Sequence, residues 1–410
     1  MTWRSRPSKD NEKMKRTNIT ELKPTKRQAK LLKEMLVLAG AVWNQANYQL
    51  RQEFFQKHKI NSSHALLQRV NQKSEVYQTL GRSYALPLLH KLDETWRSFK
   101  NLFREFEKGK TDKPSPPHYF KDRKLNITLP AFLVFDSLQY HIKRRKVHLP
   151  ISRAMRKQGV HQLNIRFDGK PRWGGNQLRG ELHYNKTTKK FYLCQAIDVP
   201  DPKLKEGETV AIDLGIKRPI VAYNGEKAVI YKFHKTQQDW ENLTGEITRL
   251  QSIAKSRNGI NTTRRIDNLS LKRSRQLEQR FNFIVKDLIR KFPDAGTFIV
   301  GDLTNIRKRV PGSCRKARRM INNYWSCAKL VRKLANKAQE IGATFAKRDE
   351  RSTTKTCPVC GEKNKPADRS YECFFCGYRQ DRDVVGAINI WRRYVSTGSR
   401  LRPALTEVMV

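Results

Sequence analysis

Acidic residues are scarce in this chain of 410 residues: 38 Asp and Glu stand against 84 Lys and Arg, for a formal net charge of +46. A compact protein with so large an excess of one sign repels itself, and a polyanion such as nucleic acid relieves that repulsion. A basic protein of the membrane surface would concentrate its cations in one amphipathic helix, whereas Lys and Arg occur here along the whole length. The composition therefore predicts nucleic acid as the first partner to consider.

Long apolar runs are also lacking. No segment approaches the roughly 20 apolar residues that span a bilayer, and no apolar stretch of a secretory signal follows the basic N-terminus. We therefore expect no membrane association and a cytoplasmic, nucleoid-associated protein. Hydrophobic residues make up 38% of the chain and are well distributed, so its length predicts two or three folded domains.

Cysteine is rare and unevenly placed. Of the seven cysteines, Cys194, Cys314 and Cys327 stand alone, and the other four lie between residues 357 and 376. An odd number in this arrangement argues against a disulfide framework.

The clustered cysteines form two C-x-x-C pairs, Cys357/Cys360 and Cys373/Cys376, with twelve residues between the pairs. This spacing is typical of four thiolates around one tetrahedral Zn²⁺. A redox pair or an iron–sulfur site is the alternative. Because four cysteines leave no open coordination position, we expect the zinc to be structural.

The secondary-structure signal changes along the chain. Residues 1–16 are polar and predict a loose arm, and Thr25 to Gln28 form a capping box that opens an amphipathic helix. A second helix is indicated by Leu92, Trp96, Phe99, Phe103 and Phe106, which recur at steps of four and three. After the Pro-rich residues 108–117, short β-prone runs between residues 125 and 199 predict a small barrel.

Acidic residues follow apolar runs at several distant points after residue 207. Asp213 ends the run 209–213, Asp302 ends 297–302, Glu350 follows 343–348, and Asp381 and Asp383 precede a short apolar helix. If these strands are neighbours in a sheet, the carboxylates converge, and two Mg²⁺ ions would offset their repulsion and catalyse phosphodiester hydrolysis. The alternative is that the acids merely cap strands and helices on a solvated face.

Several motifs together resemble the transposon-encoded TnpB nucleases and the compact type V CRISPR effectors. They are Asp213-Leu-Gly215, the Thr-x-x-x-Cys-Pro-x-Cys-Gly sequence at 353–361, Asp381-Arg-Asp383 with the helix at 386–390, and residues 22–28 with Trp43-Asn44. The resemblance covers nearly the whole chain. The cysteine pairs with Asp-Arg-Asp are its specific part, because Asp-Leu-Gly strands occur in many RNase H-like proteins.

The resemblance implies an α/β multidomain fold: an OB-like barrel called the wedge domain, with an inserted helical recognition domain, followed by an RNase H-like (RuvC) nuclease domain with an inserted zinc ribbon. The implied division is an arm and first wedge strand at 1–24, the recognition domain at 25–118, the wedge domain at 119–206, the first RuvC part at 207–351, the ribbon at 352–379 and the last RuvC part at 380–410.

The resemblance also implies site residues and partners. Asp213 and Asp383 correspond to the first and third RuvC acids, whereas the middle acid of the family is replaced by Gly301. Asp302 is next in sequence, but strand alternation would turn it to the other face, so we favour Glu350. Val385 departs from the family's usual Asn. The implied partners are a guide RNA and target double-stranded DNA with a short flanking motif.

The resulting hypothesis is an RNA-guided, Mg²⁺-dependent DNA endonuclease with catalytic acids Asp213, Glu350 and Asp383. Gly301 sustains one alternative, a nuclease-inactive RNA-guided DNA-binding protein that acts like a repressor. A second alternative is a DDE-type transposase, against which the zinc ribbon argues. Basic segments at 264–265, 272–275, 307–309 and 315–319 could contact phosphates or could simply be solvated helix faces.

Overall fold

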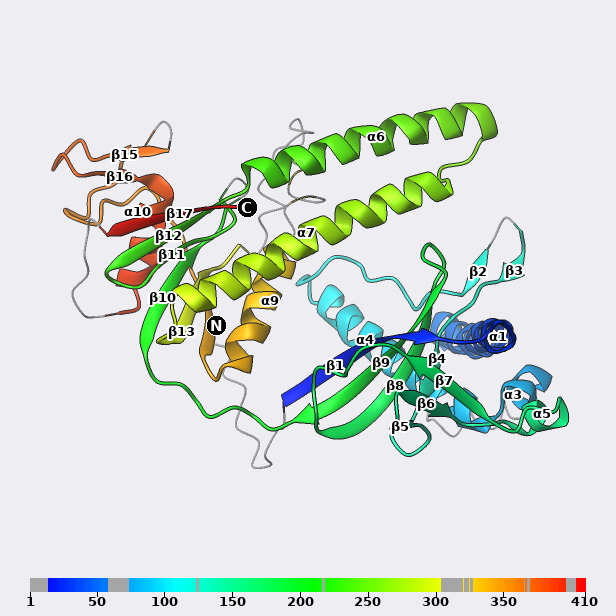
Figure 1. Ribbon diagram of the computed structural model, residues 1–410. Helices are drawn as coiled ribbons and strands as arrows, with labels where there is room; N and C mark the ends of the chain where they lie inside the picture. Colours follow the sequence, from blue (N-terminus) through cyan, green and yellow to red (C-terminus); the bar gives the residue numbers. More distant parts are fainter. Residues whose placement is uncertain are drawn as a thin grey trace. The chain divides into compact units, whose positions relative to one another are not determined.

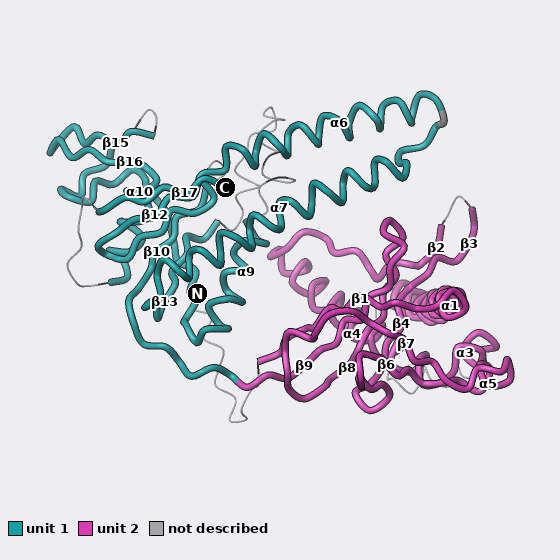
Figure 2. Tube along the Cα trace, viewed as in Figure 1, with its two compact units in different colours: residues 1–11, 201–410 teal, residues 12–200 magenta. Residues whose placement is uncertain are grey.

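The structure is a computed structural model that describes residues 14–57, 74–122, 125–215, 218–303, 320, 324, 327–364, 366, 369–395 and 403–410. The chain folds as two compact units, which we call the N-terminal unit (residues 12–200) and the C-terminal unit (residues 201–410) (Figure 2). Among the helices described, none is both long enough and apolar enough to cross a bilayer.

The N-terminal unit is built on a seven-stranded antiparallel sheet with the order β4-β8-β9-β1-β7-β6-β5 (Figure 1). Its strands are β1 (Met14–Lys23), β4 (Leu133–Phe135), β5 (His141–Lys143), β6 (Lys146–Leu149), β7 (Leu163–Phe167), β8 (Asn176–Asn185) and β9 (Lys190–Val199). A separate short hairpin joins β2 (Lys121–Asp122) to β3 (Ile127–Thr128). Closure of the larger sheet into an OB-like barrel stays a prediction.

The first strand corrects one expectation. Residues 14–16 do not belong to a loose arm, because β1 pairs with β9 from Met14 to Leu22. The family resemblance implied a first wedge strand within residues 1–24, but the residue pattern did not show it, since polar side chains take some of the buried positions of β1: Asn18 is 3% exposed and Thr20 is 9% exposed. Because polar residues occupy both exposed positions and some buried positions of this strand, the sequence shows no clear alternation of apolar and polar residues there.

The described residues of the N-terminal unit also form the helices α1 (Lys26–Lys57), α3 (Glu75–Leu80), α4 (Arg82–Glu107) and α5 (Arg153–Lys157). The capping box is confirmed, because the Thr25 backbone N–H donates to Gln28 Oε1 at 3.0 Å and the Gln28 N–H donates to Thr25 Oγ1 at 3.3 Å. The helix predicted around Trp96 is α4, whose buried side chains join those of α1 and the sheet in one core.

The C-terminal unit contains a six-stranded mixed sheet with the order β14-β13-β10-β11-β12-β17. Its strands are β10 (Glu208–Asp213), β11 (Val221–Tyr223), β12 (Lys227–Lys232), β13 (Ala295–Gly301), β14 (Thr344–Arg348) and β17 (Ala404–Met409). β10, β13 and β14 are parallel neighbours, so they end at the same edge of the sheet. β17, which was not predicted from the pattern of residues, pairs in parallel with β12.

Helices cover both faces of this sheet. The core on one face includes side chains from α7 (Arg264–Lys291) and α9 (Cys327–Glu340), and α6 (His234–Asn258) runs beside α7 (Figure 1). The core on the other face includes side chains from α10 (Arg382–Arg392). A small hairpin of β15 (Ser370–Glu372) and β16 (Arg379–Asp381) leads into α10.

The basic segments 264–265 and 272–275 lie on α7, where Arg265 pairs with Glu246 at 3.0 Å. The segments 307–309 and 315–319 and Cys314 lie outside the described residues. The finer division at residues 24, 118, 206, 351 and 379 stays a prediction.

Candidate active site and metal centre

Strand alternation in β10 and β13 decides which residues face α10. Ala211 of β10 and Ile299 of β13 both pack in the core that contains α10. Because alternate residues of a strand share a face, Asp213 and Gly301 are directed to the same side of the sheet as these two residues. The ends of two neighbouring strands therefore bring one carboxylate and one glycine toward α10.

The Asp213 carboxylate lies against α10 at Gly386. A Cβ placed on Gly386 would lie 3.1 Å from Asp213 Oδ2 and 3.1 Å from Thr354 Cγ2, a tight contact on both sides. Glycine inside a helix costs about 1 kcal/mol relative to alanine. Here it leaves room for the carboxylate beside the helix.

Glu350 occupies the space that a side chain at position 301 would need. A Cβ built on Gly301 would lie only 2.1 Å from Glu350 Oε2. Gly301 is paired with Arg348 across the parallel strands, and Glu350 follows two residues later. The Asp302 backbone N–H donates to the Arg348 carbonyl at 2.8 Å. The Glu350 carboxylate thus lies where a side chain at position 301 would begin.

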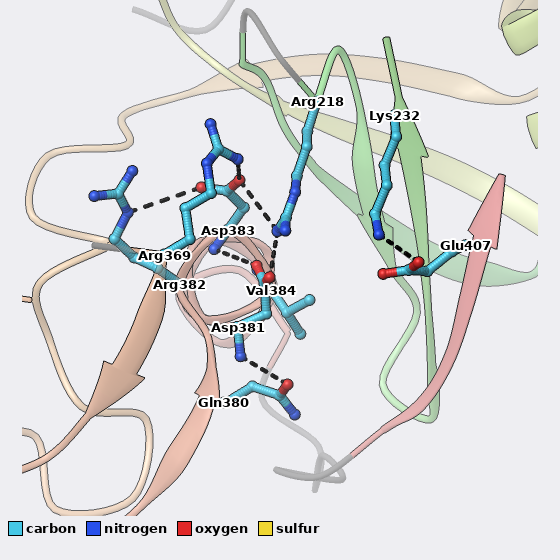
Figure 3. A network of polar contacts seen from close by, with 9 residues as sticks. All are labelled: Arg218, Lys232, Arg369, Gln380, Asp381, Arg382, Asp383, Val384 and Glu407. Atoms are coloured by element: carbon cyan, nitrogen blue, oxygen red, sulfur yellow. Dashed lines mark hydrogen bonds and ion pairs between the residues drawn. The ribbon is translucent and has the colours of Figure 1, made fainter. Parts of the chain in front are cut away.

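Asp383 is held by arginines (Figure 3). Arg369 Nη1 donates to Asp383 Oδ2 at 2.6 Å, and Arg218 Nη1 lies 3.4 Å from the same oxygen. The Asp383 side chain is only 14% exposed, so these ion pairs are shielded from solvent more than ordinary surface pairs. The guanidinium groups offset the negative charge at this end of the site.

Asp381 has a different role from Asp383. Its Oδ1 accepts the backbone N–H groups of Asp383 at 2.9 Å and Val384 at 3.4 Å, which makes it the N-cap of α10. Its other oxygen, Oδ2, pairs with Arg218 (Figure 3). Asp381 therefore fixes the turn that presents Asp383.

The three acids influence one another electrostatically. Burial, followed by the carboxylates of Glu350 and Asp383, raises the pKa of Asp213 well above its usual value. Among the described residues, the group whose ligand atoms lie close enough together to hold a metal ion is instead the four cysteines. The three acids form one electrostatic cluster, in which Asp383 is paired with Arg369 and Arg218.

A groove of about 600 Å³ adjoins Asp383. Its lining includes Arg218 and Arg369, Lys232 at the end of β12, and His234 and Gln237 of α6. Lys232 also pairs with Glu407 of β17 (Figure 3). Glu241 lines the groove as well, so the groove is polar and contains side chains of both charges.

The cysteine pairs meet as the sequence predicts. Cys357 Sγ lies 3.6 Å from Cys376 Sγ, Cys360 Sγ lies 3.6 Å from Cys373 Sγ, and all four sulfur atoms are within 4.8 Å of one another. Four thiolates at 2.3 Å from a tetrahedral ion would be separated by about 3.8 Å. The cluster can therefore hold one metal ion without rearrangement.

Backbone N–H groups prepare one of these thiols for metal binding. Burial alone would raise the pKa of Cys373, but hydrogen bonds from the N–H groups of Cys376 and Phe375, and further ones with the Cys360 and Asn364 side chains, lower the pKa to about 6. The thiolate is the form that binds metals. Within the described part of the chain, neither Cys194 nor Cys327 forms a disulfide.

Val385 connects the cysteine cluster to α10. It packs in a small buried core with Cys357, Tyr371, Cys373 and Tyr378. The departure from Asn at this position therefore gives an apolar contact between the helix and the ribbon, and the cap of the helix is supplied by Asp381 instead.

Sequence reasoning missed Arg218, Arg369 and Gly386. Arginine is so frequent in this chain that neither Arg218 nor Arg369 carried a signal. Gly386 did carry one, because a glycine inside an apolar helix commonly marks a close approach.

These features define an α/β protein in which an acidic cluster and a four-cysteine centre share one compact unit. The family described as "Cas12f1-like, TNB domain" matches residues 328–390, and the family described as "Probable transposase" (OrfB_IS605) matches residues 192–307. These ranges include the cysteine cluster and all three acids.

Relatives extend the match over the chain. TnpB-like protein ORF457 of Acidianus two-tailed virus is 27% identical over 93% of this chain and 87% of its own length. The CRISPR-associated endodeoxyribonuclease Cas12f1 of Sulfoacidibacillus thermotolerans is 32% identical over 27% of this chain and 25% of its own length.

A solved structure, the cryo-EM structure of a Cas12f1–sgRNA–target DNA complex, shares the fold, with 16% identity, a TM-score of 0.55, and coverage of 89% of this chain and 83% of that chain. The chain is thus similar to a TnpB-like protein over most of its length, and it shares the fold of a compact Cas12f1 effector.

The raised pKa of Asp213 predicts a stabilising substitution. Above the pKa that Asp has in the unfolded chain, about 3.9, ionisation of Asp213 costs the folded state stability, and below it both states are protonated. In EDTA at pH 7, we expect Asp213→Asn to raise the Tm of the C-terminal unit by at least roughly 2 °C, the effect of about 1 kcal/mol in a unit of this size. Near pH 3 the two proteins should melt together.

Differential scanning calorimetry of wild type, Asp213→Asn and the exposed control Asp294→Asn measures this effect. The control should not change Tm. An Asp213→Asn protein that melts no higher than wild type at pH 7 would contradict the electrostatic cluster.

Proposed function

We propose that the chain is an RNA-guided DNA endonuclease that cuts target DNA by two-metal hydrolysis in a RuvC-type site. The observation that carries the proposal is the convergence of Asp213, Glu350 and Asp383, which come from β10, the end of β14 and α10. The name of one relative and the complex in which Cas12f1 was solved support guide RNA and DNA as partners.

The donor set fits Mg²⁺. Carboxylate oxygens are the ligands that this hard cation prefers, and a carboxylate whose pKa is raised by two others gains most from a neutralising cation. Asp213, Glu350 and Asp383 would hold the metal. When bound, a pair of Mg²⁺ ions supplies an activated water and stabilises the leaving oxygen of a phosphodiester.

The chain's own residues prepare this site. Gly301 and Gly386 leave space for the Glu350 and Asp213 carboxylates, and Asp381 fixes the turn before Asp383. In the groove beside Asp383, Arg218 and Lys232 would attract the phosphates of the DNA strand. Sequence specificity would come from pairing between guide and target.

We further propose the domain functions that the family resemblance implies. The helices α1, α3 and α4 would be the recognition domain, and the sheet around β1 would be the OB-like wedge domain. The C-terminal unit would be the RuvC domain with its ribbon at 352–379, because β10, β13 and β14 end side by side and carry or border the acids.

We also propose that the cysteine cluster binds one structural Zn²⁺. The convergence of all four sulfur atoms from the two C-x-x-C pairs supports zinc over a redox role, since a redox pair needs only two cysteines.

A nuclease-inactive RNA-guided DNA-binding protein is the second candidate. Two observations favour it: a glycine stands where the family has its middle acid, and Asp383 is engaged by Arg369 and Arg218. Cleavage assays of the wild-type protein separate the two.

The zinc proposal predicts one Zn²⁺ per chain. The double substitution Cys373→Ser/Cys376→Ser should release it and destabilise α10, because Val385 packs against the cysteine core. Mass-spectrometric metal analysis of the purified proteins measures the content, with Cys194→Ser as the control that keeps its zinc. Full zinc content in the double variant would refute the assignment.

The acid cluster predicts a pattern of four alanine variants. Asp213→Ala, Glu350→Ala and Asp383→Ala should each abolish Mg²⁺-dependent cleavage while leaving RNA and target binding nearly unchanged, because binding depends on phosphate contacts elsewhere. Asp302→Ala should cost far less.

The assay is cleavage of a plasmid matched to the guide, which is identified by sequencing the RNA that copurifies. An active Glu350→Ala together with an inactive Asp302→Ala would transfer the middle role to Asp302. A wild-type protein that binds its target and never cuts would favour the nuclease-inactive candidate.

The contact between Gly301 and Glu350 predicts a reciprocal exchange. Gly301→Ala should displace Glu350 and lower the cleavage rate by about 100-fold, the effect of misplacing a catalytic group by about 1 Å. Moving the acid back, with Gly301→Glu and Glu350→Gly together, should restore part of the activity lost in Glu350→Gly alone. Single-turnover cleavage rates measure both effects, and wild-type rates in Gly301→Ala would show that the close approach is irrelevant.

A further inference from the structure

A short loop of the N-terminal unit is fixed to β1 by a buried amide. The side chain of Asn18, 3% exposed, donates from Nδ2 to the Trp173 carbonyl at 2.9 Å and accepts the Trp173 backbone N–H at Oδ1, also at 2.9 Å. These two bonds satisfy the backbone of Trp173 in the way that a neighbouring strand would. The loop between β7 and β8 is thereby held at one residue.

The amide belongs to a row that crosses three strands. Gln195 Nε2 on β9 donates to Gln177 Oε1 on β8 at 2.9 Å, and Asn18 Nδ2 lies 3.4 Å from Gln195 Oε1. Gln177 Nε2 in turn donates to the carbonyls of Ser137 and Tyr140 at 2.7 and 2.8 Å. Buried amides are costly unless they are satisfied, and a satisfied row fixes one geometry.

Gly175 fixes the other end of the loop. Its φ is +147°, and a Cβ there would lie 2.1 Å from the Asp198 carbonyl oxygen of β9. Only glycine allows this approach of the loop to the sheet. The loop is therefore anchored on both sides of Gly174.

The anchored loop presents an aromatic ring between cations. The Arg172 guanidinium lies 4.7 Å and the Arg16 guanidinium 5.6 Å from the centre of the Trp173 ring. Lys170 and Arg172 are exposed, and Trp173 is partly exposed. The acid of the loop, Asp168, lies 3.6 Å from Lys23, so the charge around the indole is positive.

We propose that this surface, formed by Arg16, Lys170, Arg172 and Trp173, binds an unpaired nucleotide of an RNA. Unpaired bases in RNA loops and bulges stack on aromatic rings and on arginine planes, and both are offered here in contact with each other. Lys170 and Arg16 supply charge for the flanking phosphates. The inference rests on the proposed function, since the RNA would be the guide, but it concerns a surface in the N-terminal unit and not the acids.

Trp173 fluorescence tests the proposal without any cleavage. The full-length wild type and Trp173→Phe are titrated with a poly(U) oligonucleotide and with poly(dT) of the same length, and the difference between the two proteins reports the indole at 173. We expect poly(U) to quench the wild-type emission and Trp173→Phe to lose that part of the quenching while it keeps nearly the same affinity. Stronger quenching by poly(dT) than by poly(U) would overturn the assignment to RNA.

Alanine variants measure the contribution of the surface to affinity for the RNA that copurifies. Trp173→Ala and Arg172→Ala should each weaken binding by about fivefold or more, the value of one stacked base. Arg156→Ala, an exposed arginine of the same unit, is the matched control and should stay near wild type.

The outcomes separate the two levels of inference. A wild-type protein that binds no RNA would overturn both the proposed function and this surface. A wild-type protein that binds RNA, with unchanged quenching in Trp173→Phe and unchanged affinity in Arg172→Ala, would overturn the surface alone.

Discussion

Mutual repulsion among three carboxylates at one corner of the C-terminal unit is the constraint around which its other features are arranged. Burial and two neighbouring acids raise the pKa of Asp213, so the charge there must be balanced by cations or by protons. Arg218 and Arg369 balance it at Asp383. Gly301 and Gly386 leave the carboxylates room to approach, although a glycine inside a strand or a helix destabilises that element.

The segment that contains the four cysteines packs against α10, the helix that carries Asp383. Val385 and two of the cysteines share a buried core, and Asn389 Nδ2 donates to the carbonyls of Thr353 and Thr356 at 2.7 Å each. The segment that leads into the first cysteine pair is therefore bonded to the helix that carries Asp383. Since α10 also packs on the sheet beside β10, the geometry of the acids depends on the ribbon as well as on the strands.

Much of this arrangement was predictable from the sequence, because the relevant signals are local. The capping box at Thr25, the apolar runs that end in Asp213 and Asp302, and the two C-x-x-C pairs each follow from local patterns of residues. The path of β1 and the contacts of Arg218 and Arg369 were not predictable. β1 buries polar residues that bond to a loop more than 150 residues away, and two particular arginines cannot be told apart from the other basic residues by composition.

The approach of Glu350 to Gly301 follows from the pairing of β13 with β14. β13 and β14 are parallel neighbours in register, so a side chain two residues past Arg348 can fold back over Gly301. A residue with a Cβ at 301 would occupy that volume, so the glycine and the displaced acid depend on each other. Arg369 and Arg218 meanwhile hold Asp383 on the opposite flank. A divalent cation at Asp383 Oδ2 would therefore compete with the guanidinium groups of Arg369 and Arg218, which couples cation binding there to the position of Arg369.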